Sequence, residues 1–139
     1  MTKWTIEDSR DLYNIRGWGS EYFDINNKGH IIIQPQYGSN HSIDLKELVE
    51  DIQGKGYSLP ALIRFSDILK ASIAKLANAF NKSIKEYDYK GTYHGVYPIK
   101  VNQQRQVVEE IVKFGRPYNF GLEAGSKPEL HAILAIMDN

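Results

Sequence analysis

Toward its C-terminus the chain alternates between two kinds of apolar pattern, and this alternation constrains its fold more than any other feature. A short run with strand character, "YHGVYPIKV" (93–101), precedes a helix predicted from about Gln103 to Phe114. A second short run, "YNFGLEA" (118–124), precedes another amphipathic stretch. Strands and helices that alternate over short connections predict a parallel sheet with right-handed crossovers, so we expect an α/β fold.

The two predicted helices have recognisable ends and one apolar face each. Gly115 and Pro117 are stop signals for the first helix, and Ser126 with Glu129 has the spacing of a capping box at the start of the second. The apolar faces consist of Val107, Val108, Ile111 and Val112 on the first helix, and of Leu130, Ile133, Leu134 and Met137 on the second. Amphipathic faces of this kind are expected to be buried.

The first part of the chain has β character. "YFDIN" (22–26) and "HIII" (30–33) flank a short connection that contains Asn and Gly, which favours a hairpin. "LPALIRF" (59–65) is a short apolar run and predicts a further strand. Between these strands we expect a loop that contains Pro35, Gly38, Ser39 and Asn40.

Two more helices are predicted in this first part and after it. Asp44 begins a short helix, with Glu47 at capping-box spacing, and Gly54 and Gly56 end it. Ser66 can cap the longest helix of the chain. That helix carries an apolar stripe, which must pack against another element, formed by Leu69, Ile73, Leu76, Phe80 and Ile84.

The number of strand and helix units is small for the fold that they predict. A barrel of eight such units takes about 250 residues, whereas only two units are present here. An open sheet of two parallel strands buries little apolar surface. We therefore expect the chain to be the N-terminal piece of a longer protein.

Composition excludes several classes of function. The chain has 17 Lys and Arg against 17 Asp and Glu, so no net charge attracts nucleic acid or an anionic membrane. It has no cysteine, which excludes disulfides and thiolate zinc sites. The four histidines are scattered without metal-ligand spacing, so we predict no metal site among these residues. No apolar run approaches the roughly 20 residues of a membrane span, and we expect a soluble, cytoplasmic protein.

Lys100 is the most unusual residue of the predicted strands, because a lysine is seldom buried without a partner or a chemical role. Side chains alternate along a strand, so Lys100 is expected to point to the sheet or barrel interior, near the carboxyl end of the strand. The opposite face, toward the helices, is expected to carry Tyr97, Ile99 and Val101. Active sites of α/β barrels lie at that end, and a desolvated amine there can attack a carbonyl group, most commonly that of pyridoxal phosphate.

A structural role for this lysine is the alternative. Lysines at strand ends reach solvent while their stems cover apolar surface. Pro98 also argues against an interior strand, because proline cannot donate to a hydrogen-bonded ladder.

Several segments of the chain closely resemble biosynthetic arginine decarboxylases. They are "WGSEYFDIN", "LPALIRFSDIL", "GVYPIKVNQQRQVVEEIV" and "FGLEAGSKPEL", in the order of the family's N-terminal part. The resemblance covers essentially the whole chain. It implies a pyridoxal-phosphate enzyme of the alanine-racemase-like group, with a (β/α)8 barrel and a β domain. Residues 1–65 would contribute strands to the β domain, and residues 66–139 would begin the barrel with its first two βα units.

The resemblance also implies a site and a reaction. Lys100 matches the lysine that binds pyridoxal phosphate, and Glu123 matches an acidic position close to it that orients the lysine or holds its ammonium group. The family converts L-arginine to agmatine and CO2 in polyamine biosynthesis, uses magnesium, and forms homo-oligomers with shared active sites. Phosphate-binding glycines and a ring-stacking histidine come from later strands, so neither the glycines of "GLEAGS" nor His94 is assigned such a role. Capping of the next helix is expected of Asn102.

Two alternatives stay open from the sequence. One is a decarboxylase or racemase of the same fold that acts on another amino acid. The other is a non-catalytic fragment or interaction module. The 139-residue chain alone is expected to have no decarboxylase activity.

Overall fold

The structure is a computed structural model that describes residues 3–35 and 41–137. Gly38, Ser39 and Asn40 of the predicted loop lie outside the described residues. The chain divides into two compact units, unit 1 (Met1–Ile68) and unit 2 (Leu69–Asn139), and each is described by itself.

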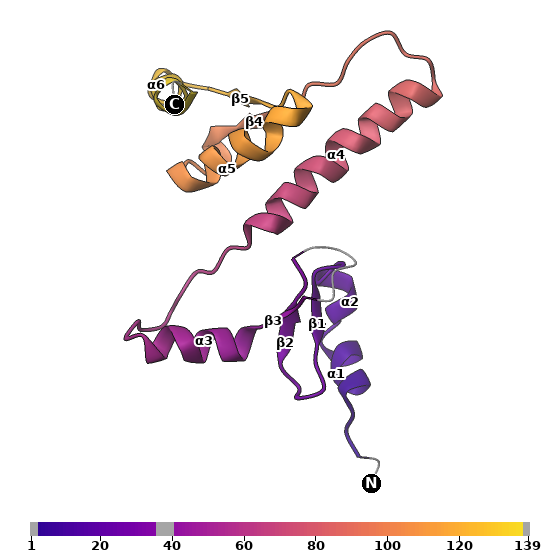
Figure 1. Cartoon of the computed structure of the whole chain (residues 1–139), viewed down its shortest axis with the longest axis vertical. Helices are drawn as coiled ribbons and strands as arrows, with labels where there is room; N and C mark the ends of the chain where they lie inside the picture. The colour runs from indigo at the N-terminus through magenta and orange to yellow at the C-terminus, as the bar shows by residue number, and fades with distance from the viewer. Residues whose placement is uncertain (1–2, 36–40, 138–139) are drawn as a thin grey trace. The chain divides into compact units, whose positions relative to one another are not determined.

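Unit 1 is built around a three-stranded antiparallel sheet with the strand order β1-β2-β3 (Figure 1). Phe23 pairs with Ile33 and Ile25 with Ile31, which confirms the predicted hairpin. Ile25 and Ile33 are buried, as is Ile15 in the preceding helical segment. The elements are α1 (Ile6–Leu12), α2 (Ile15–Trp18), β1 (Phe23–Ile25), β2 (Ile31–Ile33) and β3 (Ile43–Asp44).

The helix predicted at Asp44 is α3 (Leu45–Gly54). Asp44 is its N-cap, and its carboxylate accepts hydrogen bonds from the backbone N–H groups of Lys46 and Glu47. The return half of the predicted capping box is missing, since Glu47 Oε1 instead binds Lys28 Nζ at 2.7 Å. Side-chain capping of this kind satisfies N–H groups that a helix start leaves unpaired.

The strand predicted at 59–65 is wrong. These residues form neither helix nor strand, and Leu62 is 76% exposed. An extended run becomes a strand only when a neighbouring strand pairs with it, and no other described segment pairs with this run.

The longest helix is α4 (Ser66–Glu86). Ser66, predicted to cap this helix, is instead its first residue. Ile73 of the predicted apolar stripe is buried, but Leu76 and Phe80 are 44% and 46% exposed. Phe80 stacks on Tyr93, with 4.0 Å between the ring centroids and 3° between the ring planes. The stripe is therefore only partly covered.

Unit 2 contains the predicted parallel strand pair, β4 (Val96–Pro98) and β5 (Gly121–Glu123). The strands pair in parallel from Val96 opposite Gly121 to Pro98 opposite Glu123, which confirms the strand and helix alternation. Both strands are shorter than the runs that predicted them. The remaining elements are the 3-10 helix η1 (Ile99–Val101), α5 (Arg105–Gly115), the 3-10 helix η2 (Arg116–Tyr118) and α6 (Lys127–Met137).

The two helices cover one face of the strand pair. A core of Ile99, Val108 and Ile133 is buried, and the partly buried side chains packed against it are Tyr97, Leu122, Ala124 and Ile136. The prediction of a fully buried α6 face is wrong, because the exposed fractions are 47%, 50% and 55% for Leu130, Leu134 and Met137. Only the part of α6 that faces this small core is covered by described elements.

Phe120 fits between two glycines that precede β4 and end α5. A Cβ atom at Gly95 would lie 1.9 Å from Phe120 Cε2, and one at Gly115 would lie 2.5 Å from Phe120 Cβ. The N–H of Gly121 then donates to the carbonyl oxygen of Gly95 at 2.8 Å. This close approach sets how β5 enters the sheet beside β4.

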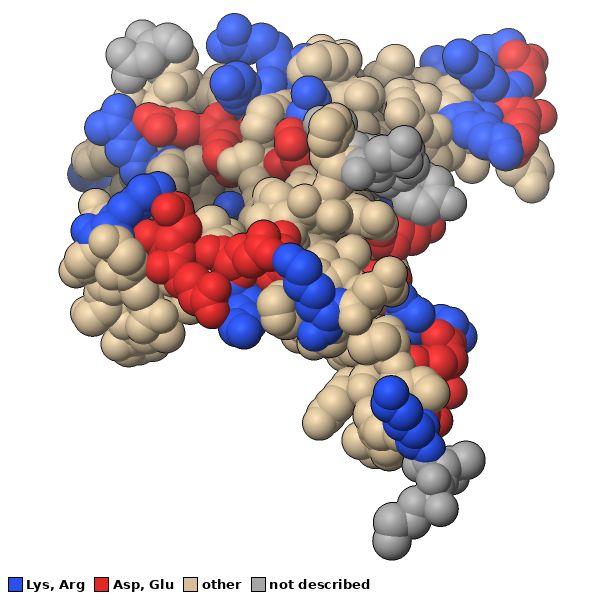
Figure 2. All heavy atoms as spheres, turned by 60° about the horizontal axis from the view of Figure 1, so that its bottom comes forward, with Lys and Arg blue, Asp and Glu red and all other residues tan. Residues whose placement is uncertain are grey.

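Charged side chains of both signs are interspersed on the molecular face that Figure 2 shows. Among the described residues, no helix is both long enough and apolar enough to cross a membrane.

Candidate functional site

The two predicted site residues lie at the same edge of the parallel strand pair. Glu123 is the last residue of β5 and stands opposite Pro98, the last residue of β4. Lys100 is the middle residue of η1, the turn that directly follows β4. Because parallel strands share their carboxyl edge, the fold brings both residues to that edge, where ligands bind in open α/β sheets and barrels.

Lys100 does not lie within a strand as the sequence predicted. Side chains alternate only as far as Ile99, which is 2% exposed and belongs to the helix-covered core with Tyr97. The 3-10 turn then rotates successive side chains by about 120° instead of 180°. As a result Val101, predicted to face the helices, is 69% exposed, and Lys100 is exposed rather than desolvated.

The Lys100 amine and the Glu123 carboxylate are both available. Within residues 3–35 and 41–137, neither side chain has a hydrogen bond or an ion pair. Some other exposed charges of the chain are paired, as Lys55 is with Asp51 at 2.6 Å. An exposed, unpaired primary amine is the group that a carbonyl cofactor needs for covalent attachment, so this edge fits such a cofactor.

Two hydrogen bonds close the turn around Lys100. The Tyr97 hydroxyl donates to the backbone carbonyl of Asn102 at 3.3 Å, and Asn102 Oδ1 accepts from the backbone N–H of Gln104 at 3.0 Å. Asn102 was predicted to cap α5, but the N-cap is Gln104, which makes no side-chain capping bond. The hydrogen bond that the Asn102 side chain accepts from Gln104 forms an Asx-turn before the helix. Nothing in the strand pattern singles out the Tyr97 hydroxyl, so the sequence does not predict this contact.

The turn between β5 and α6 holds only capping interactions. Glu129 N–H donates to Ser126 Oγ at 3.4 Å, and Glu129 Oε2 accepts from the N–H of Gly125 at 2.7 Å. This agrees with the capping role predicted for Ser126 and Glu129. The Gly125 amide is therefore engaged and does not offer an open phosphate site.

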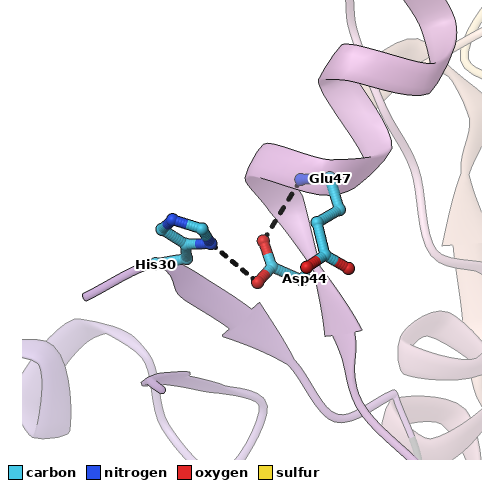
Figure 3. Close-up of side chains that lie close together, drawn as sticks. All are labelled: His30, Asp44 and Glu47. Atoms are coloured by element: carbon cyan, nitrogen blue, oxygen red, sulfur yellow. Dashed lines mark hydrogen bonds and ion pairs between the residues drawn. The ribbon is translucent and has the colours of Figure 1, made fainter. Parts of the chain in front are cut away.

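A second group of polar side chains lies in unit 1, where the end of the hairpin meets the start of α3 (Figure 3). Asp44 Oδ2 lies 2.8 Å from His30 Nδ1 and accepts a hydrogen bond from Asn26 Nδ2 at 2.7 Å. Possible ligand atoms of His30, Asp44 and Glu47 all lie within 4.8 Å of one another. The members of this group come together only through the hairpin and the helix start, so the sequence does not predict the group.

This second group is a structural network. Burial alone would raise the pKa of Asp44, but hydrogen bonds from His30, the Glu47 amide and Asn26 outweigh it and hold the pKa at about 2. Both Asp44 oxygens already accept bonds, and Glu47 is paired with Lys28. The network ties β2 to the cap of α3.

Comparisons with known proteins point to one family of enzymes. The chain is 60% identical over 137 residues to a biosynthetic arginine decarboxylase of Gloeobacter violaceus, covering 99% of this chain and 21% of that protein. It is 54% identical over 136 residues to the enzyme of the same name from Phocaeicola vulgatus, covering 98% of this chain and 21% of that protein. No model of a protein family matches the chain.

A solved structure gives the same result. The crystal structure of the biosynthetic arginine decarboxylase of Campylobacter jejuni matches with a TM-score of 0.80 and 40% sequence identity, over 89% of this chain and 20% of that chain. The chain spans about a fifth of the length of the curated relatives it matches. The resemblance found in the sequence is confirmed, and it extends over nearly the whole chain.

Proposed function

We propose that this chain is the N-terminal portion of a biosynthetic arginine decarboxylase and supplies the lysine that holds pyridoxal phosphate. The observation that carries the proposal is the position of Lys100 at the carboxyl edge of a parallel strand pair, where Glu123 ends the neighbouring strand. The 60% identity to a curated arginine decarboxylase supports it. The proposed reaction of the whole enzyme converts L-arginine to agmatine and CO2 for polyamine synthesis.

The proposal assigns a place in the enzyme to each unit. Unit 1 contributes strands to a β domain, and β4, α5, β5 and α6 are the first two βα units of a (β/α)8 barrel. The parallel pairing of β4 with β5 supports this assignment, as do the helices that cover one face of the pair. In a barrel the other face would turn inward.

The two site residues have separate tasks in this proposal. Pyridoxal phosphate, when bound, supplies the electron-accepting ring that allows CO2 to leave the α-carbon of an amino acid. Lys100 would hold the cofactor through its amine. Glu123 is the carboxylate that ends the paired strand, and it orients the Lys100 amine or stabilises its ammonium form.

Further features of the whole enzyme follow from the family resemblance. They are a requirement for magnesium, a homo-oligomeric state, and a cytoplasmic location. The Gly125 amide is engaged by Glu129 and is not a phosphate contact. The resemblance implies that the phosphate contacts come from later strands.

A grafted enzyme, in which a relative supplies the remainder of the polypeptide, tests the proposal. In it, the 139-residue chain replaces the matching segment of the Gloeobacter violaceus relative, and agmatine formation from L-arginine is measured. We expect activity with the native chain and a loss of at least about 1000-fold with Lys100→Arg, which keeps the charge but cannot anchor the cofactor. The 139-residue chain alone should form no agmatine.

The control variant is Lys113→Arg, an exposed lysine in the last turn of α5, which should leave activity unchanged. Activity that survives in Lys100→Arg would refute the assignment of the lysine.

A further inference from the structure

The turn that carries Lys100 is fixed on both sides of the lysine. Before it, Ile99 is 2% exposed and packs in the core of unit 2. After it, Val101 is 69% exposed, so apolar packing does not hold this side. The Tyr97 hydroxyl holds this side of the turn by donating a hydrogen bond to the carbonyl oxygen of Asn102 at 3.3 Å.

The Tyr97 hydroxyl bridges the turn from strand to loop. Its ring packs against the core beside Leu122, its register partner in β5. A phenylalanine ring could fill the same place. The hydroxyl adds one interaction, a bond that joins β4 to the residue two positions after the lysine. The loop is closed further where Asn102 Oδ1 accepts from Gln104 N–H at 3.0 Å.

We propose that Tyr97 is a positioning residue for Lys100: its hydroxyl holds the η1 turn in the form that presents the lysine amine at the carboxyl edge of the sheet. The inference rests on the proposed function of Lys100. Lysine has a long, flexible stem, and among the described residues no partner fixes the Lys100 amine itself. The backbone of the turn is therefore the part that this chain can preorganise, and preorganised geometry raises the rate of attachment.

The test measures how fast the lysine captures the cofactor. The grafted enzyme, freed of cofactor, is mixed with pyridoxal phosphate and quenched with borohydride at intervals. Mass spectrometry then gives the initial labelling rate of Lys100 relative to that of exposed Lys113. In Tyr97→Phe this ratio should fall about fivefold, the factor expected from the loss of one ordinary hydrogen bond. The melting temperature should stay close to that of the native enzyme.

Tyr118→Phe is the matched control, since the Tyr118 hydroxyl has no hydrogen bond to the described residues. It should leave the ratio unchanged. An unchanged ratio in Tyr97→Phe would overturn the positioning role and leave the proposed function intact. If the native grafted enzyme labels Lys100 no faster than Lys113, the proposed function itself fails, and the positioning role fails with it.

A second pair of variants covers the case in which Tyr97→Phe does not fold. Asn102→Ala removes the acceptor that closes the loop to Gln104, whereas Asn102→Asp keeps an acceptor oxygen. We expect a severalfold lower labelling ratio for the alanine variant and a native ratio for the aspartate variant. Equal ratios for both would contradict the claim that the closed turn positions Lys100.

Discussion

The polar network around Asp44 in unit 1 and the residues Lys100 and Glu123 in unit 2 differ in their partners. In unit 1, Asp44 accepts bonds from His30, Asn26 and the start of α3, and Arg10 binds Asp24 at 2.7 Å. In unit 2, the side chains of Lys100 and Glu123 have no partner within the described part of the chain.

This difference separates groups that stabilise a fold from groups that are available for chemistry. A part-buried polar group contributes to stability only when its hydrogen bonds are satisfied. A cluster of satisfied groups, such as the one around Asp44, can meet metal-ligand distances and still be structural. An unpaired amine at the carboxyl edge of parallel strands is the stronger candidate for a functional site.

The largest effect expected in a stability measurement tests the packing at the start of the strand pair, at the end opposite the candidate site. Gly95→Ala would place a Cβ 1.9 Å from Phe120 Cε2, so β5 could not approach β4 as it does. We expect the free energy of unfolding to fall by about 3 kcal/mol, as measured by urea denaturation of the full chain.

Gly121→Ala is the control for this change, because a Cβ there meets no atom within 4 Å. Its stability should be unchanged or higher by about 0.5 kcal/mol. Similar losses in both variants would show that glycine flexibility, rather than the contact with Phe120, decides the packing.

The next effect tests the network of unit 1. Asp44→Ala removes the cap of α3 and the bonds to His30 and Asn26, so the melting temperature should fall on the order of 5–10 °C. Asp51→Ala removes only an exposed pair with Lys55 and should cost on the order of 2 °C. Equal shifts would mean that the network contributes no more than a surface ion pair.

Acid should weaken the same network in the native chain. The pKa of Asp44 in the folded state is about 2, below its ordinary value of 3.8. A lowered folded-state pKa stabilises the fold above the unfolded-state value, and this contribution is lost as the pH falls from about 4 toward 2. Melting curves across this range should show a steeper acid loss for the native chain than for Asp44→Asn. Parallel curves would contradict the role of the Asp44 carboxylate.

The smallest expected change in stability is that of a variant at Glu123, the unpaired carboxylate at the end of β5. Glu123→Gln should alter the free energy of unfolding by less than about 0.5 kcal/mol, because the carboxylate has no partner among the described residues. In the grafted enzyme it should lower kcat about tenfold if Glu123 assists Lys100. A large loss of stability with unchanged kcat would make Glu123 a structural residue, like Asp44.

The elements that the sequence predicts well are those with a local cause. The hairpin at 22–33, the helix capped by Asp44, and the two strand and helix pairs all have periodicity or end signals of their own. The failed predictions depend on neighbours that a local pattern cannot specify. Residues 59–65 have no paired strand, and most of the apolar α6 face has no covering element among the described residues.

The candidate site could be predicted in kind but not in geometry. The residues around Lys100 carry the family resemblance, and parallel pairing accounts for the shared edge with Glu123. Strand alternation misplaced Val101, because the chain turns into a 3-10 helix directly after Pro98. The Tyr97 bond across this turn depends on that change of backbone form, so no strand pattern could predict it.

The most direct test locates the cofactor itself. The grafted enzyme is equilibrated with pyridoxal phosphate, reduced with borohydride and digested, and each labelled lysine is identified by mass spectrometry. The account predicts about one label per chain, on the peptide that contains Lys100. Label on a different lysine, or label spread evenly over the exposed lysines, would contradict it.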